Sequence, residues 1–216
     1  SCGGGLGPDK VYTFTLSTAQ DVFISAISSQ FNPVIYLASF CGGSTWCNDN
    51  AYAGVNASAL IVGSLPAGTY YLVVDSTTSS VGTGAFTLES YANNNYAEGA
   101  SCGQPMRLTS GYFGSTCGYG DYYGRNCATG YNMEERVFYF IVESTRTVAA
   151  DTCYYSYDTV VEYRDTCNTG YLICNDDYCA TAGGGRVSRS FSPGVYFFFV
   201  EGWSACQTFQ TYVTGL

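Results

Sequence analysis

The segment Val11-Tyr12-Thr13-Phe14 returns 126 residues later as Val137-Phe138-Tyr139-Phe140. Further segments match at the same spacing: 64–71 with 190–197, and Cys41 with Cys167. Only Cys47-Asn48-Asp49 departs from it and returns one residue later, as Cys174-Asn175-Asp176. Strands, turns and cysteines that match at one spacing indicate two copies of one fold.

The beginnings of the two copies set their boundaries. Ser1-Cys2-Gly3 matches Ser101-Cys102-Gly103 only 100 residues later, so the second copy contains extra residues before Glu135. We therefore predict a first module over 1–92, a linker over 93–100 and a second module over 101–216. The extra residues form an insert at about 106–132 that is rich in Tyr, Gly and Cys.

Alternation of hydrophobic and polar residues predicts half-buried strands. Tyr12, Phe14 and Leu16 alternate with threonines in this way. Further strands are predicted at 22–26, 34–38, 59–62, 69–75 and 85–89, and in the second copy at 137–142, 147–152, 159–163, 186–191, 195–201 and 211–213. This pattern, without a convincing helix, predicts an all-β, disulfide-rich fold of two tandem antiparallel β-sandwich modules of the jelly-roll or immunoglobulin-like kind.

The composition excludes two classes of partner. The formal net charge is −9, whereas binding to nucleic acid or to an anionic membrane surface requires a basic face. No apolar run approaches the ~20 residues of a membrane-spanning helix, and the longest, 195–200, has the length of a buried strand. We expect a soluble, acidic protein that neither binds nucleic acid nor inserts into a membrane.

Eleven cysteines without a single histidine indicate an oxidising compartment. Zinc-thiolate sites usually show paired Cys-x-x-Cys motifs, which are absent from this sequence. We therefore expect disulfides and a secreted, extracellular or cell-surface location. Recurrence in both copies favours the local pairs Cys41–Cys47 and Cys167–Cys174, and Cys117–Cys127 is a plausible local bridge within the insert.

An odd number of cysteines leaves one thiol over. The second copy contains eight cysteines and the first contains three, which makes Cys2 the candidate for the unpaired residue. Either Cys2 pairs with Cys102 and another thiol stays free, or Cys2 crosslinks to a neighbouring subunit.

The ordered set of motifs resembles the bacterial pre-peptidase C-terminal (PPC) domain family. The first copy carries the resemblance in 8–14, in Cys41 to Asp49, and in 66–75. The second copy carries it in 135–140, 157–161, 167–177 and 193–196, and the insert at 106–132 lies outside it. The resemblance implies a compact, non-catalytic β-sandwich that accompanies secreted hydrolases or cell-surface proteins, and of which some members bind calcium or insoluble polymers.

Acidic clusters follow the paired cysteines. Asp49 and the pair Asp176-Asp177 lie in segments suited to Asx-turns, which is the structural interpretation. The same side chains, joined by Asp75, are candidate oxygen ligands for calcium, although the spacing is not that of an EF-hand. No other cofactor is predicted.

The usual parts of a catalytic site are missing. Without histidine, neither a Ser-His-Asp nor a Cys-His arrangement can form. Adjacent carboxylates such as Asp176-Asp177 do not by themselves flank a cleft as the two carboxyl groups of a glycosidase do. We therefore expect a protein that is not an enzyme.

Aromatic residues on loops are the candidate contact surface. Exposed tyrosines give rigid contact area at low entropic cost. The candidates for binding or assembly are Tyr112, Phe113, Tyr119, Tyr122, Tyr123 and Trp46. Two functions remain open: a structural subunit that assembles with itself into an extracellular filament, appendage or surface coat, and a secreted adhesion module, accessory to a secreted hydrolase, that binds a polysaccharide or protein polymer.

Overall fold

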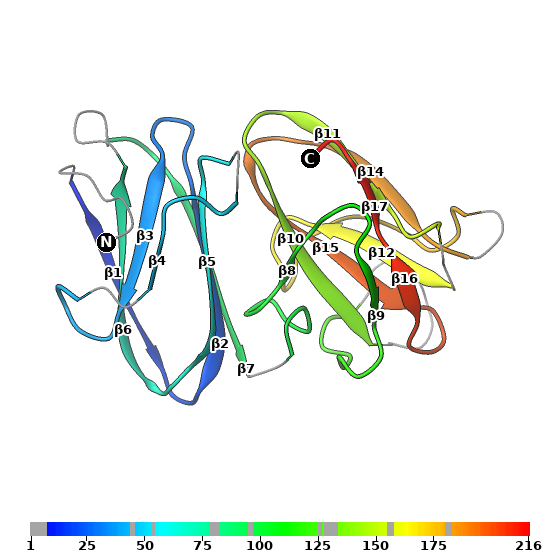
Figure 1. Cartoon of the computed structure of the whole chain (residues 1–216), viewed down its shortest axis with the longest axis horizontal. Helices are drawn as coiled ribbons and strands as arrows, with labels where there is room; N and C mark the ends of the chain where they lie inside the picture. The colour runs from blue at the N-terminus through cyan, green and yellow to red at the C-terminus, as the bar shows by residue number, and fades with distance from the viewer. Residues whose placement is uncertain are drawn as a thin grey trace. The chain divides into compact units, whose positions relative to one another are not determined.

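The computed structural model describes residues 8–43, 46–52, 55–77, 83–94, 97–124, 127, 134–154, 158–179 and 183–216. Every regular element within these ranges is a β-strand, which confirms the all-β class (Figure 1). The chain divides into two compact units, Ser1–Asn95 and Tyr96–Leu216. Each unit is described below by itself.

The first unit consists of two sheets with a hydrophobic core between them. Its four-stranded sheet has the order β1 (Lys10–Leu16), β6 (Gly68–Ser76), β3 (Pro33–Ala38), β4 (Trp46–Asn48). Its three-stranded sheet has the order β5 (Ser58–Leu65), β2 (Gln20–Ile27), β7 (Thr87–Asn94). Both sheets contribute to one core, for example Ile24 from β2 and Leu37 from β3, which gives the unit a sandwich-like form.

The second unit repeats this arrangement and adds to it. A five-stranded sheet has the order β13 (Tyr171–Asn175), β12 (Thr159–Arg164), β15 (Gly194–Gly202), β10 (Glu135–Val142), β8 (Met106–Arg107). A three-stranded sheet has the order β14 (Arg186–Phe191), β11 (Arg146–Asp151), β17 (Tyr212–Thr214). A small third sheet pairs β9 (Phe113–Ser115) with β16 (Thr208–Gln210).

The strand orders of the two units correspond. The order β1-β6-β3-β4 is matched by β10-β15-β12-β13, and β5-β2-β7 by β14-β11-β17. The registers also agree, since Tyr12 pairs with Leu72 and Phe138, 126 residues later, pairs with Phe198. A shared strand order and register is what duplication of one module produces.

The boundary between the copies differs from the prediction at one point. Asn93 and Asn94 were expected in the linker, but they form the end of β7, where they pair with Asp21 and Gln20 of β2. Asparagine has a low strand propensity, and the hydrogen-bonded ladder with β2 outweighs it here.

Candidate functional site

The insert of the second unit is built into the sheet. Its β8 lies parallel to β10, with Met106 opposite Phe138. The Leu108 N–H donates to the Tyr139 carbonyl at 2.8 Å, and the Val137 N–H donates to the Gly99 carbonyl at 2.7 Å. Because these bonds lie along one edge of β10, the insert and the segment before it cover that edge.

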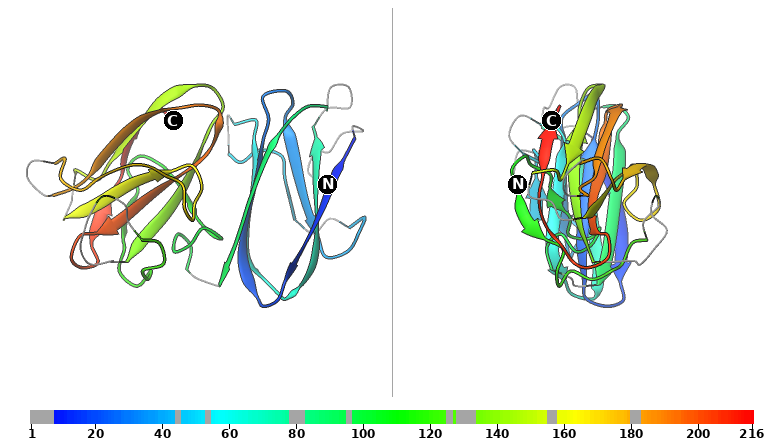
Figure 2. Two further views of the ribbon diagram at one scale, coloured as in Figure 1. Left: turned by 180° about the vertical axis from the view of Figure 1, so that it is seen from behind. Right: turned by 90° about the vertical axis from the view of Figure 1, so that its right-hand side faces the viewer.

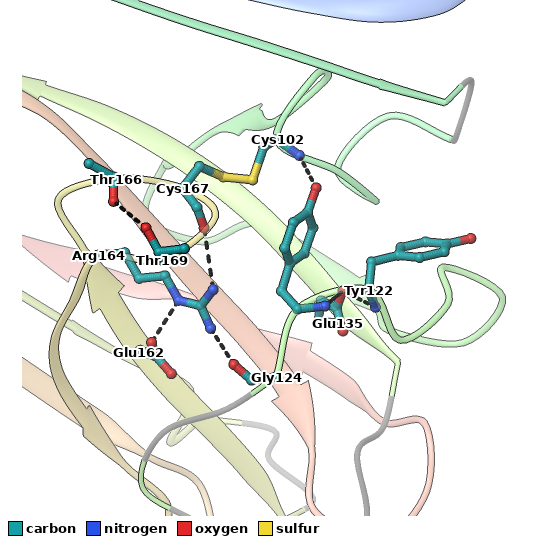
Figure 3. Close-up of a disulfide and its surroundings, with 10 residues drawn as sticks. Cys102, Tyr122, Gly124, Glu135, Glu162, Arg164, Thr166, Cys167 and Thr169 are labelled. Carbon is teal, nitrogen blue, oxygen red and sulfur yellow. Dashed lines mark hydrogen bonds and ion pairs between the residues drawn. A yellow bond between two sulfur atoms is a disulfide. The ribbon is translucent and has the colours of Figure 1, made fainter.

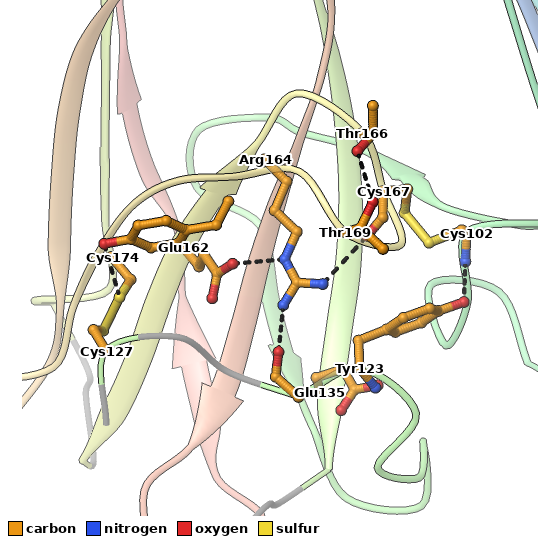
Figure 4. A network of polar contacts seen from close by, with 12 residues as sticks. Cys102, Tyr123, Cys127, Glu135, Glu162, Arg164, Thr166, Cys167, Thr169 and Cys174 are labelled. Carbon is orange, nitrogen blue, oxygen red and sulfur yellow. Dashed lines mark hydrogen bonds and ion pairs between the residues drawn. A yellow bond between two sulfur atoms is a disulfide. The ribbon is translucent and has the colours of Figure 1, made fainter. Parts of the chain in front are cut away.

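Disulfides fasten the insert to distant parts of the unit. Two bridges start within the insert, Cys117–Cys206 and Cys127–Cys174, and Cys102–Cys167 starts just before it. Figure 3 shows Cys102–Cys167, and Figure 4 shows it together with Cys127–Cys174. The predicted local pairs Cys167–Cys174 and Cys117–Cys127 are therefore wrong, as is a Cys2–Cys102 bridge. Sequence proximity misled the prediction, because the chain folds Cys117 against a residue 89 positions away.

The remaining cysteines also differ from expectation. Cys41 is a free, exposed thiol, so the predicted Cys41–Cys47 pair is wrong, while Cys47 is disulfide-bonded. Cys153 pairs with Cys179. The candidate intermolecular residue Cys2 lies outside the described residues.

Glu135 binds the backbone of the insert at Tyr122 and Tyr123. Its Oε1 accepts hydrogen bonds from the N–H groups of Tyr122, at 2.8 Å, and of Tyr123, at 3.2 Å (Figure 3). The residue is fully buried, and its Oε2 has no hydrogen-bond partner among the described residues. Burial, together with the charges of Glu201 and Asp121, raises the pKa of Glu135 to about 8, although the two backbone N–H groups oppose this shift.

Arg164 joins the insert to the centre of the five-stranded sheet. Its Nε forms a buried ion pair with Glu162 Oε1 at 2.6 Å. Its Nη2 donates to the Gly124 carbonyl at 2.7 Å and its Nη1 to the Cys167 carbonyl at 3.3 Å (Figure 4). The guanidinium also lies 4.1 Å from the ring centroid of Phe199. A buried charge is tolerated where it has this many partners.

A second buried arginine binds two of the predicted contact residues. The guanidinium of Arg136 lies 3.8 Å from the ring centroid of Tyr119, and its Nη2 donates to the Tyr112 hydroxyl at 2.8 Å. Tyr112 also packs edge-on against Phe138 of the core. Stacking on aromatic rings and hydrogen bonding stabilise a desolvated guanidinium. Tyr112 and Tyr119 are therefore partly buried, with their rings held by contacts within the second unit.

Glycines shape the turn between these tyrosines. Gly118 and Gly120 have φ values of 85° and 84°, a conformation that other residues rarely adopt. The turn places Tyr123 edge-on against Phe199, with its hydroxyl accepting the Cys102 N–H at 2.9 Å. The Tyr and Gly content of the insert thus has a structural cause.

Two of the six predicted contact residues face solvent. Phe113 is 62% exposed and Tyr122 is 44% exposed. In the first unit, Trp46 is only partly exposed and packs against the core. Tyr112, Tyr119 and Tyr123 are committed to internal contacts, as described above.

Two further exposed aromatic residues were not among the predicted contact residues. Tyr154 and Tyr178, which are 73% and 55% exposed, each adjoin one half of the Cys153–Cys179 bridge. Arg186 lies 5.1 Å from the ring centroid of Tyr178 and donates to its hydroxyl at 3.3 Å. We call these three residues the Tyr154 surface. Two tyrosines adjoining cysteines were the available signal, but the pairing of those cysteines could not be read locally.

The predicted calcium ligands do not form one cluster. Asp75 is buried and its Oδ1 accepts the Ser76 N–H, whereas Asp177 is exposed. Within the ranges described, only Cys117, Cys206 and Glu134 gather as three potential metal-ligating side chains, and that pair of sulfurs forms a disulfide. Asp49 and Asp176 are partly buried in separate units. Calcium binding stays a prediction.

No protein-family model and no curated protein matches this chain. The resemblance to the PPC family therefore remains a prediction. In the part of the chain that the structure describes, no helix has the length and hydrophobicity needed to cross a membrane.

Proposed function

We propose that the chain is a non-enzymatic extracellular structural subunit, built from two PPC-like jelly-roll modules, that assembles with copies of itself. Bridges such as Cys102–Cys167 support a location outside the reducing cytosol. The one buried carboxyl group with a strongly raised pKa, that of Glu135 among the groups described, exposes no surface to a substrate. It serves to hold the insert.

The proposal is supported mainly by exposed aromatic rings that lie on disulfide-bonded segments of the second unit. Tyr154 and Tyr178 adjoin the Cys153–Cys179 bridge, and Phe113 lies in β9, shortly before Cys117. Large rings held in place lose little conformational entropy on contact, and clustered exposed aromatic residues mark interaction surfaces. The second unit thus offers rigid apolar contact area to a partner.

The Tyr154 surface also favours the second candidate function, adhesion to a polysaccharide or protein polymer. The Tyr178 ring combines a face for stacking with a fixed guanidinium donor from Arg186. Apolar rings with a few placed polar groups are typical of sites that bind extended ligands. In this second function, the Tyr154 surface would contact a polysaccharide or protein polymer instead of another molecule of this chain.

Electron microscopy and sedimentation of the purified chain separate the two functions. Regular oligomers or filaments, weakened by the double change Tyr154→Ser and Tyr178→Ser, are expected for assembly. Tyr212→Ser is the matched control, because Tyr212 is similarly exposed but lies on β17. A monomer at every concentration, retained on a polysaccharide or collagen column through the same two tyrosines, would replace assembly with adhesion.

A further inference from the structure

The two units treat the same strand edge differently. In the second unit, the edge of β10 that faces away from β15 pairs with β8 of the insert. In the first unit, the corresponding strand β1 pairs with β6 on one side, and no strand in the described ranges pairs with its other side (Figure 2, where β1 is dark blue). In the sequence comparison, the first module has no counterpart of the insert at 106–132.

Hydrophobic residues of β1 are less buried than their counterparts on β10. Phe138 and Phe140 of β10 are fully buried, whereas their counterparts Tyr12 and Phe14 are only partly buried. Val11, whose counterpart Val137 is also buried, is 51% exposed. Beside β1 lies a groove of about 440 Å³, lined by residues of β1, β2, β6 and β7, including Tyr12, Phe14 and Leu88. In the second unit, Leu108 and Tyr112 of the insert pack against the corresponding core.

The β1 edge carries few of the features that normally prevent strand pairing. Apart from Lys10 at its first position, β1 contains no charge, no proline and no glycine, and it pairs with β6 over seven residues without a register shift. The other long edge strands of the unit are protected. The register shift between β2 and β5 makes Gly63 a bulge, and β7 carries Glu89 and two terminal asparagines.

From these observations we infer that β1 of one molecule pairs with β1 of a second molecule of this chain. The two strands run antiparallel and are related by a two-fold axis at Thr13. The inference rests on the proposed function and adds a contact between copies of the chain that is separate from the Tyr154 surface. The backbone groups that face β8 in the second unit are those of Val137 and Tyr139, so their counterparts Val11 and Thr13 direct their backbone groups outward. An antiparallel partner satisfies these groups in both copies at once.

The same pairing covers the exposed rings. With Thr13 opposite its own copy, Tyr12 of each strand lies across from Phe14 of the other, on the side that faces the groove. Cross-strand aromatic pairs stabilise antiparallel sheets. The second molecule thereby buries Tyr12 and Phe14 of β1, as the insert buries their counterparts Phe138 and Phe140 of β10.

The first test places like charges at the axis. Thr13→Lys sets two ammonium groups opposite each other, and we expect it to weaken pairing about tenfold or more in sedimentation velocity at ~0.15 M salt. Ser188→Lys is the matched control, because Ser188 is an exposed residue on the edge strand β14 of the second unit. Circular dichroism and melting verify that both variants fold.

The second test is a crosslink. Directly opposed residues in a hydrogen-bonded antiparallel pair have Cα atoms about 5.5 Å apart, within the range of a disulfide. In a Cys41→Ser background, which removes the exposed free thiol, Thr13→Cys is expected to form covalent dimers under mild oxidation. Ser188→Cys in the same background is expected to stay monomeric on a non-reducing gel.

The outcomes separate this inference from the proposed function. Oligomers that persist in Thr13→Lys, together with no Thr13→Cys crosslink, would overturn pairing through β1 and leave assembly standing. A wild-type chain that is monomeric at all concentrations would overturn both. The expected result is that Thr13→Lys weakens oligomers whereas Ser188→Lys does not, and that Thr13→Cys crosslinks efficiently whereas Ser188→Cys does not.

Discussion

The Oε1 atom of Glu135 lies 2.8 Å from the backbone nitrogen of Tyr122, in a position that exposes none of the Glu135 side chain to solvent. A buried carboxyl group thus fixes the backbone of the insert at its tip. The cost of burying the charged form makes this contact dependent on pH.

We predict that the second unit becomes less stable as the pH rises from about 4.5 to about 8. The pKa of Glu135 is raised from 4.5 to about 8, so between these values the folded chain holds a proton that the unfolded chain has released. The free energy of unfolding then falls by up to about 1.4 kcal/mol per pH unit. Melting between pH 5 and pH 9 measures this slope.

Glu135→Gln supplies the comparison for this prediction. The amide oxygen still accepts the two N–H groups but does not ionise, so the slope should flatten. Glu134→Gln, a change at the partly exposed neighbour that accepts the Gly118 N–H, should leave the slope as in the wild type. A slope unchanged by Glu135→Gln would assign the pH dependence to another group.

Arg136 is predicted to be a main stabilising contact of the insert. Arg136→Ala removes the stack on Tyr119 and the hydrogen bond to Tyr112, with an expected loss of about 3 kcal/mol. Arg146→Ala, at an exposed guanidinium that binds the Ser144 hydroxyl, should change stability by less than about 0.5 kcal/mol. Denaturant unfolding of both variants tests the contrast, and equal losses would contradict the role given to Arg136.

The disulfide connectivity can be tested by counting thiols. The double change Cys117→Ser and Cys206→Ser removes one bridge and should add no reactive thiol in denaturant. The double change Cys117→Ser and Cys127→Ser should add two, because it separates Cys206 and Cys174 from their partners. The first variant should also lose about 4 kcal/mol of stability, as expected for a bridge that closes a long loop.

Cys41 is predicted to react with a maleimide in the native state, because it is free and exposed. Peptide mass analysis should find the label at Cys41, and Cys41→Ser should remove it without a change in melting temperature. Protection of this thiol in the purified protein would indicate that Cys41 lies in a contact between copies.

Much of the fold could be predicted because it is local and repeated. The alternation in β1 and its recurrence in β10 follow from the two-residue period of a strand, and the all-β class followed from many such segments. The end of β7 could not be read in this way, because Asn93 and Asn94 are held by their pairing with β2.

The contacts made by the tyrosines of the insert could not be predicted from such local patterns. Tyr112, Tyr119 and Tyr123 had the composition of a binding loop, but they are partly buried through contacts with Arg136 and Phe199, which lie in strands outside the insert. One signal was available in principle. Glu135 and Arg136 are charged residues at the start of an otherwise hydrophobic strand, and buried charges require partners.

The Cys117–Cys206 bridge sets an order for biosynthesis. Cys206 follows β15, so this bridge can close only after almost the whole second unit has left the ribosome. The first unit, which has its own core, does not wait for that step. Closure of the Cys117–Cys206 bridge is therefore a later event than folding of the first unit.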